Sequence, residues 1–493
     1  MFDRTTIHAF ITVLGGAVLA WLLLGLPFTG IDDADIFFVY ARHFAEGHGW
    51  VYNIGGERVE GFTSMLWTLI GAGWYSIFQS LETPLFFLNL ILGTITVAAC
   101  LERTHHRATY LLLLAAAPAW FAWCQLTLME SGLWCLLLTL TGLAVADRRH
   151  RTVAALLPFL VLTRPESMAW GIWLVLLVFC FAEKGRRMKS AFPVLGSFLL
   201  SLGALIGFRL GYFGWPVPNT YYAKVTPDLL TNLISGSGYL FRYLLSGGTV
   251  FVLAVILIRV LFGRAAVRGL SFRLALFLLP GFGIPVLVGG DHFGSFRFFQ
   301  PLWPLLCLIG ALEWENQTRN LRLKPAIRAA VLPVLALAGW AVFPMVGNIR
   351  HEFRIAKEGR ANGAALTRMF EDPAARPTVA VITAGGNKFS YDGPVYDLMG
   401  LNSTEMAHAP GDAANFKNHT GFSRDVFYRW QPDILICGDS ETFDQLVLNG
   451  LHEESRFLGL YQKCTLRRNG AELQAWYRRA FLDGLADGEE LTR

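Results

Sequence analysis

Charged side chains are scarce in this sequence. Asp, Glu, Lys and Arg make up only 16% of the 493 residues, whereas soluble domains carry about 25%. Hydrophobic residues make up 54%, and the mean hydropathy is +0.42. Apolar runs of about 17–25 residues recur, long enough to cross a hydrocarbon core of roughly 30 Å. The composition excludes an ordinary soluble protein and predicts an all-α polytopic membrane domain in a lipid bilayer.

Features of several other classes are missing as well. The net charge of +5 is modest and no stretch forms a basic face, so no nucleic-acid partner is expected. The seven cysteines lack metal-type spacing, so we expect no metal site from them, and dependence on a divalent metal stays open. The first apolar run, Ile7–Phe28, is too long and too poor in preceding positive charge for a signal peptide, so an uncleaved first span is expected.

Lys and Arg are distributed unevenly among the turns. Basic turns begin at Leu101, Asp147 and Glu183, and two further clusters lie at 259–273 and 319–328. The turns between them are poor in Lys and Arg. By the positive-inside rule the basic turns face the cytoplasm. This alternation predicts about eleven transmembrane helices with a cytoplasmic N-terminus and an external first loop.

One apolar segment conflicts with that count. If both 61–80 and 84–100 crossed the bilayer, the basic turn at Leu101 would lie outside. The segment Gly61–Ser80 contains Gly71, Gly73 and three interface-favouring aromatic residues, so we expect a juxtamembrane helix that does not cross. The alternative is an ordinary span with one exception to the charge rule.

The composition changes near residue 350. Strand-like "PTVAVITAG" and "PDILICGD" alternate with helix-like segments such as "GFSRDVFYRW". We therefore expect a transmembrane domain over 1–349, followed by a small external α/β domain over 350–493. An external compartment permits a disulfide between Cys437 and Cys464, and two buried thiols are the alternative.

Polar residues of the membrane half gather in the turns assigned to the external side. Charges close to a membrane are costly unless they are paired or line a water-filled cavity, so they are candidate functional residues. The candidates are Asp32, Asp33, Asp35, Arg42, Glu60, Glu130, Arg164, Glu166, Asn219, Tyr222, Lys224, Asp291, His292 and Arg297.

Carboxylates and cations at this depth fit a lipid-linked phosphate. A carboxylate can take the proton of an attacking hydroxyl as general base, and cations stabilise the departing phosphate. We expect Asp32 or Asp33 to be the base, with Asp32 slightly favoured, and we expect the donor phosphate to contact Lys224, His292 and Arg297.

Structural roles compete with these assignments. Aspartates are favoured at helix N-termini, so capping of the expected helix "ADIFFVYARHFAEG" is the alternative role for the three aspartates at its start. Arg164 and Glu166 can form a simple ion pair, and "PNTYYAK" can form an interfacial aromatic belt. A structural hydrogen bond can account for Asp291 next to His292.

The string "DDADIFFVYARHFAEGHGWVYNIGGERVEGFTSMLW" resembles the first-loop signature of the mycobacterial terminal arabinofuranosyltransferases, within the GT-C class of integral-membrane glycosyltransferases. "TLMESGLW", "LTRPES", "VPNTYYAKV", "GGDHFGSFRFFQPLWP" and "YDGPVYDLMGLNSTEMAH" resemble later motifs of that family in the same order. The resemblance implies a GT-C fold, a decaprenylphosphoryl-arabinofuranose donor, an outward-facing site in a bacterial plasma membrane, and an essential aspartate pair, Asp32 and Asp33. Where the family commonly has an aromatic residue after that pair, this chain has Ala34 and Asp35.

Together these features predict a membrane glycosyltransferase. It would move a sugar, which the family resemblance implies to be arabinofuranose, from a polyprenyl phosphate to a hydroxyl of an extracytoplasmic glycan or glycoconjugate. The alternative is a flippase or transporter of a lipid-linked saccharide, whose polar site would be expected near the bilayer midplane, often between internal repeats.

Overall fold

The computed structural model describes residues 3–224, 228–246, 269–320, 325–346, 349–410, 421–436, 445–485 and 490–492. The chain forms two compact units, and each unit is assembled from three separate segments. The helical unit comprises Met1–Phe28, Glu82–Leu205 and Asp228–Arg350, and the α/β unit comprises Thr29–Leu81, Ile206–Pro227 and His351–Arg493. The division into domains at residue 349 stays a prediction.

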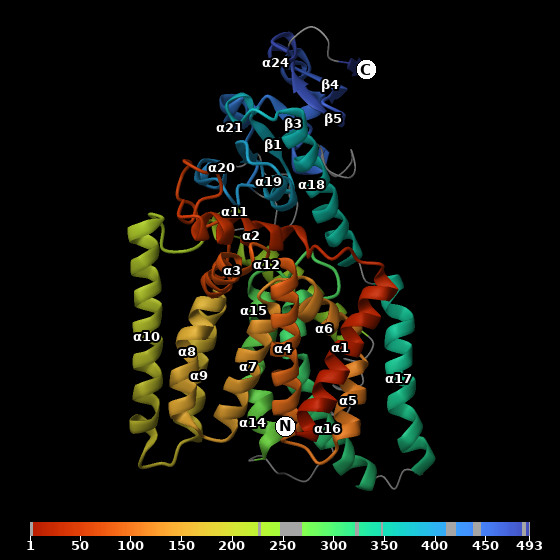
Figure 1. Cartoon of the computed structure of the whole chain (residues 1–493). Helices are drawn as coiled ribbons and strands as arrows, with labels where there is room; N and C mark the ends of the chain where they lie inside the picture. The colour runs from red at the N-terminus through yellow and green to blue at the C-terminus, as the bar shows by residue number, and fades with distance from the viewer. Residues whose placement is uncertain are drawn as a thin grey trace. The chain divides into compact units, whose positions relative to one another are not determined.

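Long apolar helices run side by side in the helical unit, together with shorter helical segments (Figure 1). In chain order they are α1 (Arg4–Leu24), α4 (Glu82–Leu101), α5 (Arg107–Ala115), α6 (Pro118–Phe121), the π-helix η1 (Ala122–Leu126), α7 (Ser131–Ala146), α8 (His150–Thr163), α9 (Ser167–Phe181), α10 (Arg187–Tyr212), α12 (Leu229–Leu244), α14 (Leu270–Phe277), α15 (Leu279–Leu287), the 3-10 helix η2 (Arg297–Leu302), α16 (Trp303–Asn320) and α17 (Pro325–Val346). The last turns of α10 belong to the α/β unit.

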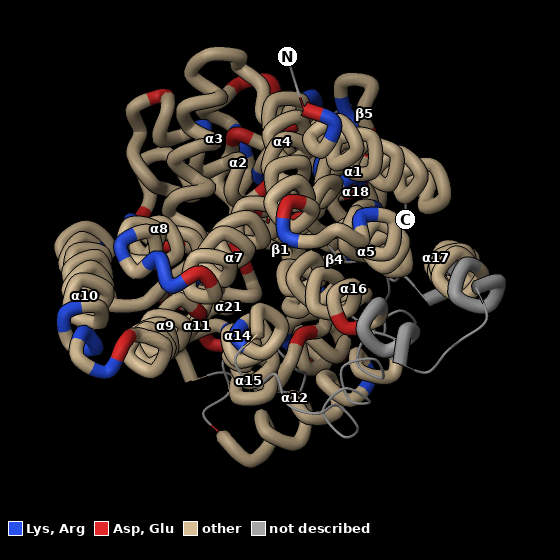
Figure 2. Tube along the Cα trace, turned by 90° about the horizontal axis from the view of Figure 1, so that it is seen from below, with Lys and Arg blue, Asp and Glu red and all other residues tan. Residues whose placement is uncertain are grey.

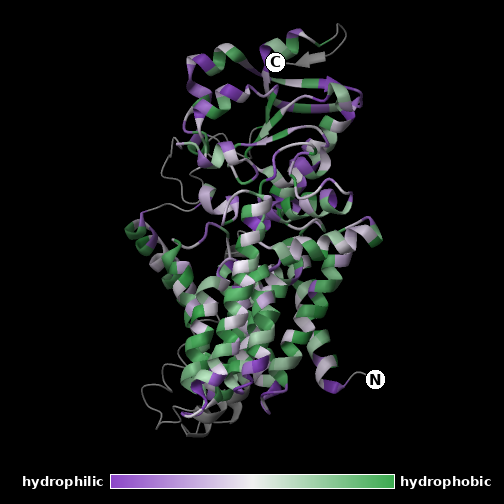
Figure 3. Cartoon of the chain, turned by 90° about the vertical axis from the view of Figure 1, so that its left-hand side faces the viewer, coloured by the Kyte–Doolittle hydropathy of each residue, from purple (hydrophilic) through white to green (hydrophobic). Residues whose placement is uncertain are grey.

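Within the described ranges, four helices are long and apolar enough to cross a membrane, or five if the bent pair 107–126 counts as one span. Green, hydrophobic positions dominate these helices in Figure 3. These helices identify a membrane protein. They confirm the prediction that the chain contains a helical membrane domain. The count of eleven spans and the orientation of the termini stay predictions.

Turns of like composition share one end of the helical unit. Arg103, after α4, donates two hydrogen bonds to Asp147, after α7, at 2.9 and 2.7 Å. Figure 2, a view from below, shows Lys and Arg at the ends of several helices, whose bodies are mostly uncharged. The two basic turns therefore lie together, as a common cytoplasmic side requires.

A six-stranded mixed sheet forms the centre of the α/β unit, with strand order β2-β1-β3-β5-β4-β6. The strands β1 (Val379–Val381), β2 (Val395–Asp397) and β3 (Ile434–Ile436) are parallel, whereas β4 (Tyr461–Arg468), β5 (Ala471–Arg478) and β6 (Glu490–Thr492) pair antiparallel. The strands expected near Pro377 and Pro432 are thus confirmed. Cys464 lies on β4, whereas Cys437 and the predicted disulfide lie outside the described residues.

Helices and connecting segments complete this unit. They are α2 (Asp32–Ala45), α3 (Met65–Phe78), α11 (Asn219–Lys224), α18 (Ile349–Met369), the 3-10 helix η3 (Pro373–Ala375), α19 (Ala384–Ser390), α20 (Thr404–His408), α21 (Arg424–Trp430), the 3-10 helix η4 (Leu451–Glu453), α23 (Ser455–Leu460) and α24 (Arg479–Asp483). Apart from Ile349 and Arg350 at the start of α18, these elements belong to the same compact unit as residues 29–81 of the first loop.

Burial explains the two halves of the sheet. All three residues of β1 and of β3 are buried, as expected for parallel strands covered on both faces. Strand β5 alternates between buried and more exposed positions from Leu473 onward, as expected for a sheet with one solvated face. Helix α3 has 14 residues, about 21 Å at 1.5 Å per residue, and its placement in the outer leaflet stays a prediction.

Candidate active site

Helix α2 begins at the aspartates singled out in the sequence. Its N-cap residue is Ile31, and Asp32, Asp33 and Asp35 occupy the first turn. Their charges suit the positive end of the helix dipole. The three side chains nevertheless contact three different parts of the α/β unit, so helix capping does not account for them.

Asp32 binds the turn that follows β1. Its Oδ1 accepts a hydrogen bond from the amide of Gly386 at 2.8 Å, and its Oδ2 accepts one from Gly385 at 3.1 Å. A Cβ atom at Gly385 would come within 1.8 Å of the Asp32 carbonyl oxygen, so only glycine permits this approach. Burial raises the pKa of Asp32 to about 6, although the two amides favour the charged form.

Asp35 is fully buried and forms an ion pair with Arg360 of α18. The Arg360 Nε donates to Oδ2 of Asp35 at 2.9 Å, and a guanidinium nitrogen also donates to the carbonyl of Thr29 at 3.2 Å. The guanidinium lies 4.0 Å from the ring centre of Phe389. These contacts fix the first turn of α2 against α18 and α19.

Asp33 faces Lys224, the last residue of α11. The Lys224 Nζ lies 4.0 Å from Oδ2 of Asp33. The exposed fraction of the side chain is 26% for Lys224 and 19% for Asp33. A carboxylate and an ammonium group are thus close together and accessible to a substrate. This pair is the centre of the candidate active site.

Asn219 holds the other end of α11. Its Nδ2 donates to the carbonyls of Gly400, Leu401 and Ser403 at 2.7–3.2 Å, and its Oδ1 lies 3.2 Å from Nε2 of His408. The ring of Tyr222 packs on His408, with centres 4.2 Å apart. Two of the predicted site residues therefore position α11 and Lys224.

Glu60 and Arg42 also have structural partners. Glu60 is buried and accepts two hydrogen bonds from Arg209 at 2.8 Å each. Arg42 donates to the carbonyl of Phe389 at 3.2 Å and lies 3.7 Å from Asp392. Both residues connect the first loop to other segments of the α/β unit.

One acid near α2 was missed in the sequence. Asp397, at the carboxyl end of β2, is buried and accepts hydrogen bonds of 2.9 Å from Met399 and from the backbone and side chain of Asn402. The negative charge of Asp397 contributes to the raised pKa of Asp32. The positive charge of Lys224 partly offsets the rise in the pKa of Asp397. Its place directly after an apolar strand within "GPVYDLMG" was a usable signal, because ligand sites gather at the carboxyl ends of parallel strands.

The remaining candidates form a cluster within the helical unit. Arg164 forms ion pairs with two glutamates. One is the buried Glu130, and the other is Glu166, whose Oε1 lies 2.7 Å from Nη2 of Arg164. Arg297 donates to Asp291 at 2.8 Å and lies over the ring of Phe293. The Arg164 guanidinium also lies 5.7 Å from the ring centre of Phe298, so the three turns predicted to be external are brought together.

His292 and Asp291 are neighbours in this cluster. The His292 amide donates to Oδ1 of Asp291 at 2.9 Å, and its Nδ1 lies 3.5 Å from the same oxygen. Lys224 belongs to the α/β unit, whereas His292 and Arg297 belong to the helical unit. Their joint contact with one phosphate stays a prediction. Over the described residues, no group of three or more His, Cys, Asp or Glu side chains has metal-site geometry.

Comparison with solved structures gives the fold class. The structure of ArnT from Cupriavidus metallidurans bound to undecaprenyl phosphate is similar with a TM-score of 0.55 and 13% sequence identity, over 96% of this chain and 98% of that one. The archaeal oligosaccharyltransferase AglB from Archaeoglobus fulgidus, in complex with an inhibitory peptide and a dolichol-phosphate, gives 0.44 and 11%, over 97% and 75%. No protein-family model and no curated protein sequence matches the chain.

The likeness to ArnT extends over nearly the whole of both chains. The chain therefore has the fold of ArnT, and this likeness supports the GT-C fold that the sequence predicted.

Proposed function

We propose that this protein is a membrane glycosyltransferase that uses a polyprenyl-phosphate-linked sugar. An acceptor hydroxyl attacks the anomeric carbon of the donor sugar. The new glycosidic bond forms as the bond from the anomeric carbon to the phosphate oxygen breaks. The hydroxyl proton goes to a carboxylate, and polyprenyl phosphate leaves with the electron pair.

The observation that carries the proposal is the pair of Asp33 and Lys224, 4.0 Å apart and partly exposed. Asp33 takes the acceptor proton as general base. Lys224 stabilises the charge that develops on the phosphate, an interaction that strengthens toward the transition state. An ArnT structure with this fold contains undecaprenyl phosphate, which supports a lipid phosphate as the leaving group here.

Asp32 has a different role in this proposal. Both of its carboxylate oxygens already accept backbone hydrogen bonds from the turn after β1. It therefore positions the start of α2, and with it Asp33, for the reaction. The family resemblance of the first loop supports arabinofuranose as the sugar and an extracytoplasmic glycan or glycoconjugate as the acceptor.

The test uses purified full-length protein in detergent with radiolabelled lipid-linked sugars, including decaprenylphosphoryl-arabinofuranose and a hexose analogue. With an acceptor glycan present, we expect release of polyprenyl phosphate in equal amount to sugar transferred. Transfer from the hexose donor alone would correct the sugar and keep the enzyme class. A protein that moves the lipid-linked sugar across a vesicle membrane and releases no polyprenyl phosphate would be a flippase, which contradicts the proposal.

A further inference from the structure

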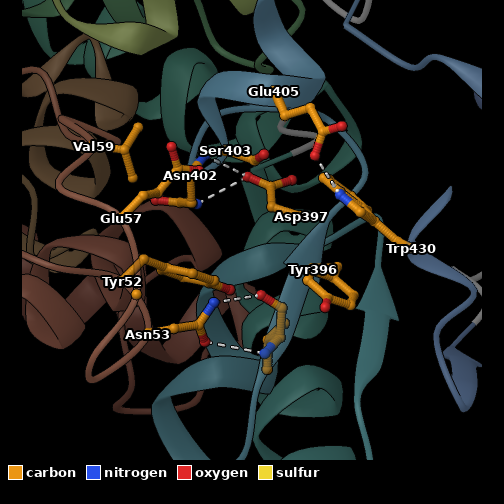
Figure 4. Close-up of a pocket in the computed structure, with 12 residues that line it drawn as sticks. Tyr52, Asn53, Glu57, Val59, Tyr396, Asp397, Asn402, Ser403, Glu405 and Trp430 are labelled. Carbon is orange, nitrogen blue, oxygen red and sulfur yellow. Dashed lines mark hydrogen bonds between the residues drawn. The ribbon is translucent and has the colours of Figure 1, made fainter. Parts of the chain in front are cut away.

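A cleft of about 290 Å³ lies in the α/β unit and is lined by two groups of residues. One group comes from residues 52–59 of the first loop, and the other comes from β2, the segment up to residue 405, and Trp430 of α21 (Figure 4). The volume is at the lower end of the range of about 300–1,000 Å³ found for small-molecule sites. The cleft can hold one or two sugar rings, and neither the sequence nor the fold assigns it a ligand.

The charge of the lining excludes an anionic ligand. Among the twelve described residues that line it are three acids, Glu57, Asp397 and Glu405, and no Lys, Arg or His. A phosphate requires cationic or amide partners in its site. The donor phosphate therefore does not bind in this cleft.

Protein donors already compensate much of the acidic charge. Glu405 accepts hydrogen bonds of 2.7 Å from Arg429 and from Nε1 of Trp430. Oε1 of Glu57 accepts one from the amide of Thr404 at 3.0 Å, and Asp397 is bound by three N–H groups. Each carboxylate oxygen can accept a second hydrogen bond. The lining thus favours a neutral ligand that donates hydrogen bonds over a cation.

Two aromatic rings supply the apolar part of the wall. Tyr396 of β2 and Trp430 are stacked, with ring centres 4.7 Å apart and planes at 18°, and both line the cleft (Figure 4). A sugar ring has an apolar C–H face that packs against aromatic rings and hydroxyl groups that donate to carboxylates. Aromatic residues next to accessible Glu57 and Glu405 match that combination.

The cleft is connected to the candidate active site within the same unit. Tyr52, which lines it, donates from its hydroxyl to the carbonyl of Ala384 at 2.7 Å. The next residue, Gly385, binds the Asp32 carboxylate. Asp397 also lines the cleft and lies at the carboxyl end of β2, so the cleft adjoins the first turn of α2.

We propose that this cleft binds a neutral saccharide, namely the sugar residues of the acceptor glycan next to the hydroxyl that is glycosylated. The acceptor role rests on the proposed function, whereas saccharide binding in the cleft does not. The cleft would hold the acceptor in register with Asp33, so it determines which glycan is extended.

Binding is tested with full-length protein in nanodiscs by titration calorimetry. The probes are a linear arabinofuranose trisaccharide, a mannose trisaccharide and a trilysine peptide. We expect one trisaccharide to bind, and we expect Trp430→Ala and Glu57→Gln each to weaken binding about tenfold or more, which corresponds to loss of a stacking contact or one charge-assisted hydrogen bond. If Trp430→Ala does not fold, Glu57→Gln decides, because Glu57 is exposed.

Glu472→Gln, an exposed acid on β5, is the matched control and should bind like the wild type. Asp33→Asn should also bind the trisaccharide although it transfers sugar about a thousandfold more slowly, which separates this inference from the proposed function. Three results would overturn the inference: no trisaccharide bound, equal binding by the cleft variants, or preference for trilysine. The wild type could bind the trisaccharide through the cleft and yet release no polyprenyl phosphate. That result would keep the cleft as a saccharide site and refute only its role in binding the acceptor.

Discussion

The carboxylate of Asp32 and the backbone amide of Gly386 are joined by a hydrogen bond of 2.8 Å, although 354 positions separate them in the chain. The bond connects the first turn of α2 to the start of α19. It explains how a loop near the N-terminus and the strand β1 can form one site.

The approach of α2 to this turn depends on Gly385. We expect Gly385→Ala to abolish most sugar transfer, because its Cβ would collide with the Asp32 backbone at 1.8 Å and displace the first turn of α2. Gly73→Ala on α3, where no atom lies within 4 Å of the added Cβ, is the control. Transfer assays on both variants test this, and a fully active Gly385→Ala would refute the role of the turn.

Lys224 should govern use of the donor. We expect Lys224→Met to lower transfer about a hundredfold, as for loss of one group that stabilises a transition-state charge. Lys357→Met, at an exposed position of α18, should change transfer little. The initial rate is measured over a range of donor concentrations, and a Lys224→Met rate equal to that of the control would remove the lysine from the site.

The buried pair of Asp35 and Arg360 should stabilise the α/β unit. Breaking a buried ion pair leaves one charge uncompensated, so we expect Arg360→Ala to lower the free energy of unfolding by about 3 kcal/mol. Arg354→Ala, exposed on the same helix, should cost far less.

A double-mutant cycle checks the coupling of this pair by denaturant unfolding in detergent. The double variant Asp35→Ala, Arg360→Ala should be less destabilised than the sum of the single variants. Strictly additive effects would show that the two side chains act independently.

The pH dependence of stability follows from Asp397. Burial raises its pKa from 3.8 to about 6, with partial compensation by hydrogen bonds from Asn402 and Met399. The folded state therefore holds this proton more tightly than the unfolded state, so ionisation lowers stability as the pH rises from about 4 to 6. Between pH 4 and pH 7, the melting temperature of the wild type should fall relative to that of Asp397→Asn. A constant or opposite difference would contradict the raised pKa.

The sequence allowed much of the local structure to be predicted. The aspartates, which are favoured at helix N-termini, indicated the start of a helix, and short apolar runs indicated β1 and β3. Both signals depend only on neighbouring residues. The fold class also followed from the length of the apolar runs and from the first-loop motif.

The different contacts of Asp32, Asp33 and Asp35 could not be predicted in the same way. It depends on partners such as Gly386 and Arg360, and Arg360 is 325 positions from Asp35. Asp397 was overlooked for a related reason, because its nearness to Asp32 arises only when β2 lies beside β1. Which acid binds backbone amides and which faces a lysine is a property of the folded unit.

In the proposed reaction Asp33, and not its neighbour Asp32, takes the proton of the acceptor. Asp32→Asn and Asp33→Asn are a matched pair of adjacent, nearly isosteric changes. The measurement is release of polyprenyl phosphate from labelled donor in the presence of acceptor, by purified full-length protein whose melting temperature is recorded in parallel. We predict that Asp33→Asn loses about a thousandfold in rate, as expected for removal of a general base, while Asp32→Asn keeps a larger share of activity. Near-normal release by Asp33→Asn, with Asp32→Asn inactive but folded, would show that Asp33 is not the general base.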